Sequence, residues 1–163
     1  MNNYMKNEKI FIKYKNKGLT GLANVGNSCY LNSCMQIFSH IYELSEFLKN
    51  GDYKKRINRK VESVVLLEWD KLRKMMWSTN CTIAPYGFVK AVQKVAQIKG
   101  HNLFCGYAQN DIQEFLLFIV DCFHIALSRE VDMQISGDTR NSKDLLAKEC
   151  YEMMKAMYKK EYS

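Results

Sequence analysis

The chain contains very few residues that interrupt helices. Its 163 residues include a single proline, Pro85, and eight glycines. Proline removes a backbone donor and clashes with the preceding turn, and both residue types mark turns and loops. Long segments therefore run without a helix breaker. This favours a mainly α fold over a turn-rich all-β fold.

A glycine-punctuated loop, residues 18–28, precedes the first predicted helix. Apolar residues after it recur at the spacing of one helical face: Leu31, Met35, Phe38, Ile41 and Leu44. This spacing predicts one helix that continues past His40. Ser28 is a suitable N-cap, which places Cys29 in the first turn. Upstream, residues 11–14 are expected to form a short strand.

Four more helices follow from the same periodicity. One covers residues 61–76, where Glu68 is the one charge expected close to the apolar face. Another follows Pro85, which is tolerated near a helix start. A third, centred on residues 115–127, is apolar around so much of its circumference that we expect it to be buried in a bundle. The last, from about residue 142 to 158, is expected to pack five apolar side chains: Leu145, Leu146, Met153, Met154 and Met157.

The charge balance is basic, with 24 Lys and Arg against 17 Asp and Glu, a net +7. Many lysines fall in two segments, Lys6–Lys17 and Lys49–Lys60, among tyrosine and asparagine, and such segments are usually solvated. No zinc-finger or RNA-binding signature accompanies them, so a nucleic acid is not favoured as a partner. No stretch of 18 residues is apolar and free of charge, and we expect no contact with a membrane interior.

The six cysteines are not arranged for metal or disulfide chemistry. No two of them form a CxxC pair. A structural zinc site and a secreted disulfide framework are therefore not favoured, and we expect no metal and no cofactor. The N-terminus also lacks the apolar core of a signal peptide. We expect reduced thiols in a cytoplasmic or nuclear compartment.

Cys29 has the setting of a nucleophile. Cysteine attacks as the thiolate, and the unpaired N–H groups at a helix N-terminus favour negative charge. Cys34, by contrast, lies well inside the predicted helix. Asn24 supplies an amide donor that could stabilise the oxyanion of an acyl-transfer intermediate. From the residues alone, an inert structural cysteine is the more common outcome for such a position.

Two longer motifs carry a family resemblance. Residues 21–36, GLANVGNSCYLNSCMQ, resemble the Cys box of ubiquitin-specific proteases, GLxNxGNTCYMNSxLQ, with Ser28 and Leu31 replacing threonine and methionine. Residues 106–116, GYAQNDIQEFL, resemble the GxQQDAxEFL segment of the same family, with Asn110 in place of the second glutamine. Two long motifs in the right order make the resemblance specific.

The resemblance implies a fold, an activity and a set of site residues. The fold would be the helical thumb subdomain of a papain-like cysteine protease, which is α+β when complete. The activity would be thiol-dependent cleavage after the C-terminal glycine of ubiquitin, with ubiquitin or ubiquitinated proteins as partners. By position, Cys29 is the nucleophile, Asn24 the oxyanion-hole donor, and Gln109 and Asp111 hold the ubiquitin tail. Asp111 is equally well explained as a helix N-cap, and both roles are compatible.

The sequence lacks a recognisable general base. Thiol proteolysis needs a group that takes the thiol proton and later protonates the leaving amine. His40, His101 and His124 are the only histidines, and none lies in the glycine-histidine-tyrosine context of the family. We therefore interpret residues 1–17 as a polar lead and 18–163 as the N-terminal, thumb part of a catalytic domain whose histidine-containing part is absent.

Three interpretations stay open at this point. The chain is a fragment of an active deubiquitinase, which the absence of a capping glycine in residues 159–163 favours. Alternatively it is a catalytically inactive protein that binds ubiquitin or acts as a scaffold. Finally, it is a helical interaction module whose Cys box only begins a helix.

Overall fold

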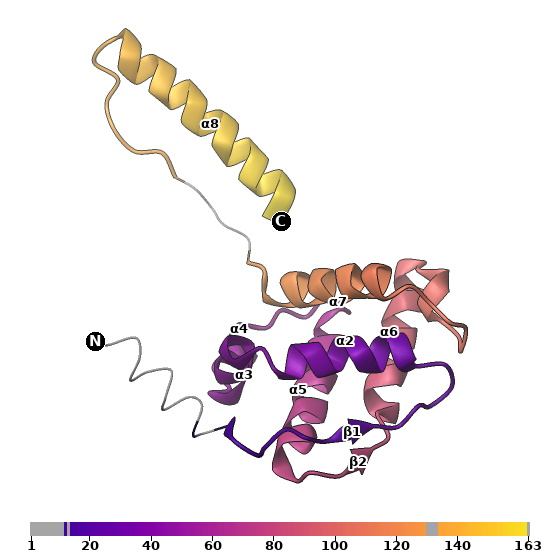
Figure 1. Cartoon of the computed structure of the whole chain (residues 1–163). Helices are drawn as coiled ribbons and strands as arrows, with labels where there is room; N and C mark the ends of the chain where they lie inside the picture. Colours follow the sequence, from indigo (N-terminus) through magenta and orange to yellow (C-terminus); the bar gives the residue numbers. More distant parts are fainter. Residues whose placement is uncertain (1–11, 13, 130–133, 163) are drawn as a thin grey trace. The chain divides into compact units, whose positions relative to one another are not determined.

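The computed structural model describes residues 12, 14–129 and 134–162, and these are mainly helical, as the sequence predicts (Figure 1). The chain forms two compact units, an N-terminal unit, Met1–Leu127, and a C-terminal unit, Ser128–Ser163. The predicted domain boundary after residue 17 stays a prediction.

The N-terminal unit is built from helices with one small parallel strand pair. Its α-helices are α2 (Cys29–Ser39), α3 (Tyr42–Lys49), α4 (Tyr53–Arg56), α5 (Ser63–Ser78), α6 (Tyr86–Lys99) and α7 (Ile112–Leu127), and a 3₁₀ turn covers Asn102–Phe104. Strand β1 (Gly21–Leu22) pairs with β2 (Thr82–Ile83), so that Gly21 lies opposite Thr82. The pair is too short to give a period-2 pattern, which is why the sequence did not reveal it.

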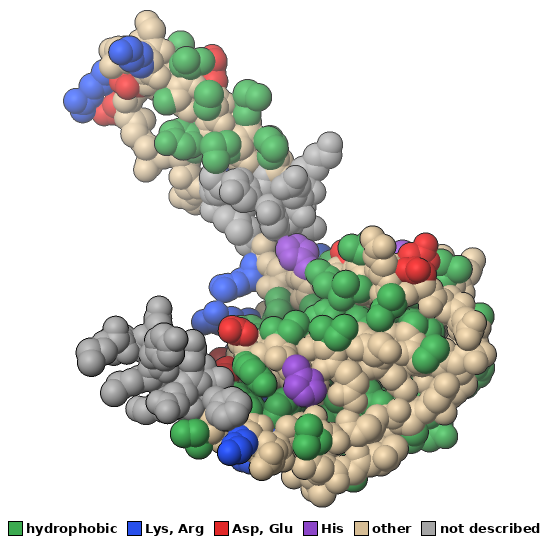
Figure 2. Space-filling model, in the orientation of Figure 1, with side chains coloured by type: hydrophobic (Ala, Val, Ile, Leu, Met, Phe, Trp, Pro, Cys, Tyr) green, Lys and Arg blue, Asp and Glu red, His purple; other side chains and the backbone are tan. Residues whose placement is uncertain are grey.

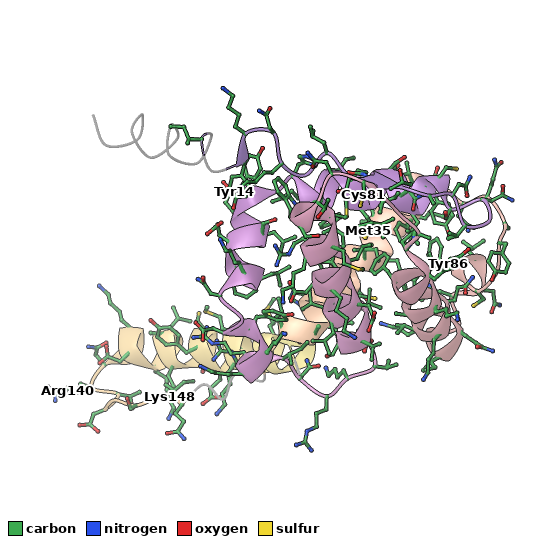
Figure 3. The ribbon with its side chains drawn as sticks, turned by 90° about the horizontal axis from the view of Figure 1, so that it is seen from below. Tyr14, Met35, Cys81, Tyr86, Arg140 and Lys148 are labelled. Carbon is green, nitrogen blue, oxygen red and sulfur yellow. The ribbon has the colours of Figure 1, made fainter. Side chains whose placement is uncertain are left out.

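The core of the N-terminal unit lies around α5. This helix packs against α6 and α7, and α2 packs against α7. Met35 of α2 and Trp69 of α5 are completely buried, and Figure 3 shows Met35 among the side chains between these helices. Burying large apolar side chains from several helices at one centre is the main source of stability for such a unit.

Two charged side chains of α5 lie inside this core. Asp70 and Arg73 of α5 are 1% and 6% exposed, and Arg73 Nη2 donates to Asp70 Oδ1 at 2.7 Å. The Tyr53 hydroxyl donates to Asp70 Oδ2 at 2.8 Å. The expectation that Glu68 is the one charge near the apolar face was therefore wrong. The buried charges are tolerated because they are paired and hydrogen-bonded, which periodicity cannot reveal.

The predicted first helix is in fact two helices. Helix α2 ends at Ser39, His40 is its C-cap, and Ile41 is extended before α3 begins at Tyr42. The carbonyl oxygen of Ser39 accepts hydrogen bonds from Trp77 Nε1 at 3.2 Å and Ser45 Oγ at 3.4 Å. These two side-chain donors take the place of the backbone N–H that would bond to the Ser39 carbonyl oxygen in a continuous helix. Tertiary contacts therefore override the apolar spacing that predicted one helix.

The strand expected over residues 11–14 is wrong where it can be checked. Residues 11 and 13 lie outside the described part of the chain. Ile12 and Tyr14 are helical rather than extended. Short runs that mix apolar and basic residues fit either structure, and the prediction rested on such a run.

Helix α7 is buried on one face only. The buried face is the stripe of Phe115, Ile119, Cys122, Phe123 and Ala126. Leu116 and Val120, which belong to the same largely apolar helix, are 40% and 48% exposed. The expectation that this helix is buried in a bundle is therefore corrected: within the N-terminal unit it is buried on one face only.

The C-terminal unit contains α8, Ser142–Tyr162. The five apolar side chains expected to pack are exposed, from 43% at Met154 to 68% at Met153, and Figure 2 shows hydrophobic side chains gathered along one side of this helix. The helix was predicted correctly and its packing was not. Of the helices that the structure describes, none has the length and apolar character needed to cross a membrane.

Candidate active site

Cys29 is the first residue of α2, and its side chain is exposed. Ser28 occupies the N-cap position, but its side chain makes no capping hydrogen bond to the helix. The thiol therefore sits at a helix start whose first amides are not satisfied by the cap residue. Such amides favour a negative charge at this point, as a thiolate nucleophile requires.

Ser28 instead closes the loop that precedes Cys29. Its backbone N–H donates to Asn24 Oδ1 at 2.9 Å, and its hydroxyl donates to the same oxygen at 3.2 Å. The Ser28 hydroxyl oxygen accepts from the backbone N–H of Val25 at 3.0 Å. These three bonds hold residues 24–28 as one small ring. The expected N-cap residue is correct, and its side chain acts on the loop rather than on the helix.

The same bonds fix the orientation of the Asn24 side chain. A backbone N–H can only donate, so the Asn24 atom that faces Ser28 is the amide oxygen. The amide nitrogen then points away from Ser28, and it makes no hydrogen bond with any described residue. Asn24 is exposed. An oriented, unused N–H₂ group five residues before Cys29 is the group that an oxyanion hole requires.

Side chains of α2 hold the loop from the other side. Asn32 Nδ2 donates to the carbonyl oxygens of Leu22 at 3.2 Å and Ala23 at 3.0 Å. Gln36 Nε2 donates to the Thr20 carbonyl oxygen at 2.7 Å. Both residues belong to the Cys box, and the structure gives them a physical role: they fix the loop relative to the helix that carries the thiol.

The second motif contacts the first through Tyr107. Asn27 Nδ2 donates to the Tyr107 carbonyl oxygen at 3.0 Å. Gly26 has a positive φ of 99°, and a Cβ added there would lie 2.7 Å from Cδ1 of the Tyr107 ring. Only glycine allows both this backbone conformation and this close approach. The two motifs, about 80 residues apart in sequence, therefore meet beside Cys29.

A further link joins Tyr30, the residue after Cys29, to Asn110. Burial raises the pKa of the Tyr30 hydroxyl, a hydrogen bond with the Asn110 side chain opposes this rise, and the nearby Cys29 adds to it. Gln109 and Asn110 lie in the loop before α7, where Gln109 is exposed and Asn110 half-buried. Asn110 replaces the glutamine of the family pattern, and here it anchors this loop to α2.

Asp111 caps α7. Its Oδ1 accepts the backbone N–H groups of Gln113 at 2.7 Å and Glu114 at 3.1 Å. The predicted capping role is confirmed by these distances. The side chain is also exposed, so its carboxylate is open to a ligand.

The buried cysteines are poor candidates for the nucleophile. Burial raises the pKa of Cys34 to about 11 and of Cys122 to about 12, so both stay protonated at neutral pH. Cys81 and Cys150 are exposed but lie outside both motifs. Cys105 is half-buried and donates to the His101 carbonyl oxygen at 3.4 Å. Cys29 alone combines exposure with the Cys-box loop.

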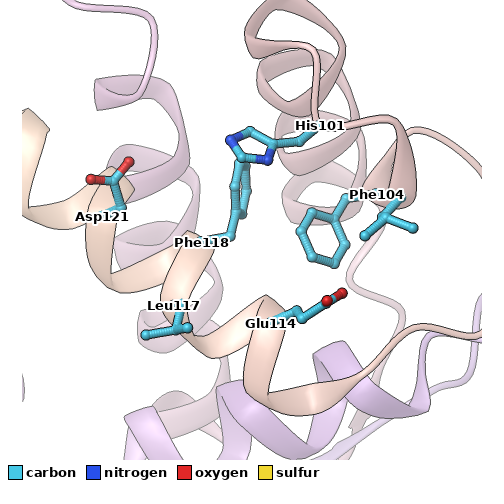
Figure 4. A pocket seen from close by; sticks show the side chains of 7 residues that line it. His101, Phe104, Glu114, Leu117, Phe118 and Asp121 are labelled. Atoms are coloured by element: carbon cyan, nitrogen blue, oxygen red, sulfur yellow. The ribbon is translucent and has the colours of Figure 1, made fainter.

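None of the histidines in the described part of the chain hydrogen-bonds Cys29. His40 caps the opposite end of α2, where its Nδ1 lies 2.8 Å from the Gln36 carbonyl oxygen. His101 lines a cavity of about 370 Å³ on the outer side of α7, together with Glu114 and Asp121 (Figure 4). Its ring packs against Phe118 with centroids 5.3 Å apart. His124 is an exposed residue of α7.

The described residues also contain no group of three or more His, Cys, Asp or Glu side chains placed to hold a metal ion. The chemistry that these residues offer is thus a thiol, an oriented amide and an exposed carboxylate. Sequence reasoning found all of these but missed Tyr107, Asn27 and the Tyr30–Asn110 pair. These residues all lie inside the two motifs, but each contact joins two residues that are about 80 positions apart in the sequence.

Comparison with known proteins decides the family. A family model described as "Ubiquitin carboxyl-terminal hydrolase" matches residues 20–161. The chain belongs to this family. Ubiquitin carboxyl-terminal hydrolase Usp2 of Drosophila melanogaster is 36% identical over 134 residues, which is 82% of this chain and 13% of that protein. Ubiquitin carboxyl-terminal hydrolase 4 of Mus musculus is 37% identical over 117 residues, 69% of this chain and 12% of that protein.

The fold comparison agrees. The structure is similar to that of the SAGA Ubp8/Sgf11/Sus1/Sgf73 DUB module bound to ubiquitin aldehyde, with a TM-score of 0.53 and 24% identity. The match covers 77% of this chain and 31% of that chain. The predicted fold class, a helical thumb portion of a papain-like protease, is confirmed. The chain spans less than a fifth of the length of the two hydrolases named above.

Proposed function

We propose that this chain is the N-terminal part of a thiol-dependent deubiquitinase catalytic domain, with Cys29 as the nucleophile. One observation carries the proposal: Cys29 stands exposed at the start of α2, at the end of a closed loop that is hydrogen-bonded to the second motif. The names of the family relatives, and the ubiquitin aldehyde bound to the similar DUB module, support ubiquitin as the substrate class.

In this mechanism each residue acts at one atom. The Cys29 thiolate attacks the carbonyl carbon of the last glycine of ubiquitin, and a C–S bond forms while the carbonyl oxygen becomes an oxyanion. The Asn24 amide N–H₂ group donates to that oxyanion. The C–N bond then breaks, the amine leaves with a proton from a general acid, and water hydrolyses the thioester.

Gln109 and Asp111 are proposed to hold the extended tail of ubiquitin. They lie in the loop before α7, which contacts the Cys-box loop through Tyr107. The Asp111 carboxylate accepts two amides of its own helix and keeps further lone pairs open to solvent. Charge-assisted bonds from a basic tail to this carboxylate would be strong.

A second function is favoured by the lack of a histidine beside Cys29 among the described residues. It is a catalytically inactive protein that binds ubiquitin or acts as a scaffold. Without a general base, thiol proteolysis loses the group that moves the proton. The two functions share a ubiquitin-binding surface and differ in turnover.

A chimera separates them. Residues 20–127 replace the matching segment of mouse ubiquitin carboxyl-terminal hydrolase 4, and hydrolysis of a ubiquitin–fluorophore conjugate is measured. We expect turnover that Cys29→Ala abolishes, whereas Cys81→Ala, a change at another exposed cysteine, leaves it intact. The 163-residue chain alone should give no turnover above its own Cys29→Ala variant. A folded chimera that binds ubiquitin without turnover would support the inactive function instead.

A further inference from the structure

The two lysine-rich segments of the sequence meet at a second cavity of the N-terminal unit. This cavity, of about 290 Å³, is lined by Tyr14, Lys17, Ser45, Lys49, Arg73, Lys74, Trp77 and Ser78. Lys17 comes from the segment before the Cys box, Lys49 from the end of α3, and the other two cations from α5. Tyr14 is labelled in Figure 3. Among the described residues, four cations and no carboxylate therefore line one concave site.

Nearby acids neutralise only part of this charge. Asp70 pairs with Arg73 at 2.7 Å and with Lys74 at 2.8 Å. Lys17 and Lys49 form no ion pair with any described residue, and both are exposed. Glu46 accepts a hydrogen bond from the Tyr14 hydroxyl, so one further carboxylate lies at the edge. The four cations exceed these two acids, which leaves the cavity positive.

A buried donor at the cavity has no partner. Arg73 is 6% exposed, and its Nε–H makes no hydrogen bond although the atom is buried. Leaving a buried donor unsatisfied is costly, and more so for a charged group. Because this Nε atom is fully covered, Arg73 acts on the cavity through the positive charge of its guanidinium. Exposed lysines alone would be explained by solvation, whereas a buried guanidinium in the wall gives the cavity a fixed cation.

The remaining lining suits a small ligand. The Tyr14 and Trp77 rings lie 5.1 Å apart in an edge-to-face arrangement, and the Trp77 Nε1–H is already used by the Ser39 carbonyl oxygen. The aromatic part of the wall therefore offers ring surface rather than further donors. A volume of about 290 Å³ is near the lower limit of small-molecule sites. Arginine and lysine together are the usual ligands of phosphate oxygens.

We propose that this cavity, between α3, α5 and residues 14–17, binds the phosphate group of a small phosphorylated molecule. Lys17 and Lys49 hold the phosphate at the mouth, and the Arg73 guanidinium and Lys74 add positive charge to the wall. This function is separate from catalysis, because no described residue of the cavity belongs to the Cys-box or GYAQND motif. The phosphate could belong to a free metabolite or to a lipid headgroup, and the experiment distinguishes these sources.

Inorganic pyrophosphate is the probe, and tryptophan fluorescence of the 163-residue chain is the readout, because Trp77 lines the cavity. The test variant is Lys17→Gln with Lys49→Gln. The matched control is Lys90→Gln with Lys94→Gln, which removes the same charge from exposed positions of α6. All titrations are compared at equal ionic strength, since salt screens non-specific attraction. Arg73 is left intact because its removal would leave Asp70 buried without its partner.

We expect saturable binding that the test variant weakens about tenfold, with less than a twofold change in the control. Flotation with phosphatidylcholine vesicles, with and without phosphatidic acid, gives the second arm. Lysine-dependent binding only to the phosphatidic acid vesicles would assign the phosphate to a lipid. Equal weakening in both variants would show a bulk charge effect and overturn the proposal, as would no binding in either arm. Deubiquitinase turnover of the chimera is measured separately, so the two proposals can fail independently.

Discussion

The N-terminal and C-terminal units contain similar helices but use their apolar side chains in opposite ways. Helix α5 places Val65, Leu66 and Trp69 at zero exposure, whereas α8 exposes Leu146 and Met153 by 62% and 68%. Neither helix contains a glycine or a proline. The difference lies in partners: α5 is surrounded by α6 and α7, while no described side chain of α8 is buried. Helical pattern therefore sets where a helix forms, and packing sets what it contributes to stability.

Removing a buried aromatic ring is expected to show the largest difference in stability between the two units. Phe115→Ala deletes a side chain that is completely buried against Tyr30 and Phe104, and we expect a loss of about 3–5 kcal/mol in the free energy of unfolding. Leu146→Ala in α8 should change it by less than about 0.5 kcal/mol. Denaturant unfolding followed by tryptophan fluorescence measures both, since Trp69 and Trp77 both lie in the N-terminal unit. Equal losses of unfolding free energy in the two variants would contradict the division between a packed N-terminal unit and an exposed α8.

The two units are also expected to differ in how their stability responds to acid pH. Burial favours a raised pKa for Asp70, but hydrogen bonds from Lys74, Arg73 and Tyr53 outweigh it and hold the pKa below the ordinary value of 3.8. Because the folded-state pKa is lowered, this group stabilises the unit fully above that ordinary value. Its contribution is lost as the pH falls from there through the folded-state pKa.

Unfolding of the N-terminal unit, followed by tryptophan fluorescence, should therefore become easier below about pH 4. Asp70→Asn should be less stable at neutral pH, because Arg73 loses its buried partner, and should show a flatter acid response. Amides of α8, followed by hydrogen exchange, should be indifferent to Asp70→Asn. An unchanged acid slope in this variant would show that other carboxylates govern the acid response.

The smallest effects compare two caps of the same design. Asp111 Oδ1 accepts two amides of α7 at 2.7 and 3.1 Å, and Asn141 Oδ1 accepts two amides of α8 at 2.9 and 3.0 Å. We expect Asp111→Ala to lower the stability of the N-terminal unit by about 1 kcal/mol. Asn141→Ala should speed exchange of α8 amides without moving the tryptophan-detected transition.

Asp111→Asn sharpens this test, because asparagine keeps the cap and removes the charge. Stability should then be retained, whereas ubiquitin binding by the chimera should weaken if the carboxylate holds the ubiquitin tail. Ubiquitin affinity equal to that of the parent chimera would leave Asp111 with capping as its only role.

The active-site region shows how far sequence reasoning reaches. Cys29, Asn24 and the capping role of Asp111 were predicted from local pattern and family resemblance, and the structure places the first two on one closed loop. The Tyr107–Asn27 contact was missed because it joins residues 80 positions apart. Residue type alone does not reveal such a pair. In the sequence, the glycine at position 26 is the local signal that another segment of the chain approaches the backbone closely there.

The sequence by itself determined the helical class, the positions of most helices and the family, and it supplied Cys29 as the proposed nucleophile. These depend on local periodicity, scarce breakers and contiguous motifs, all of which are short-range properties of the chain. Only the tertiary structure decided that α2 ends at Ser39, that Asp70 and Arg73 are buried together, and that Lys17 and Lys49 share one cavity. Each of these depends on side chains from distant segments, whose hydrogen bonds and charges outweigh local propensity once they are brought into contact.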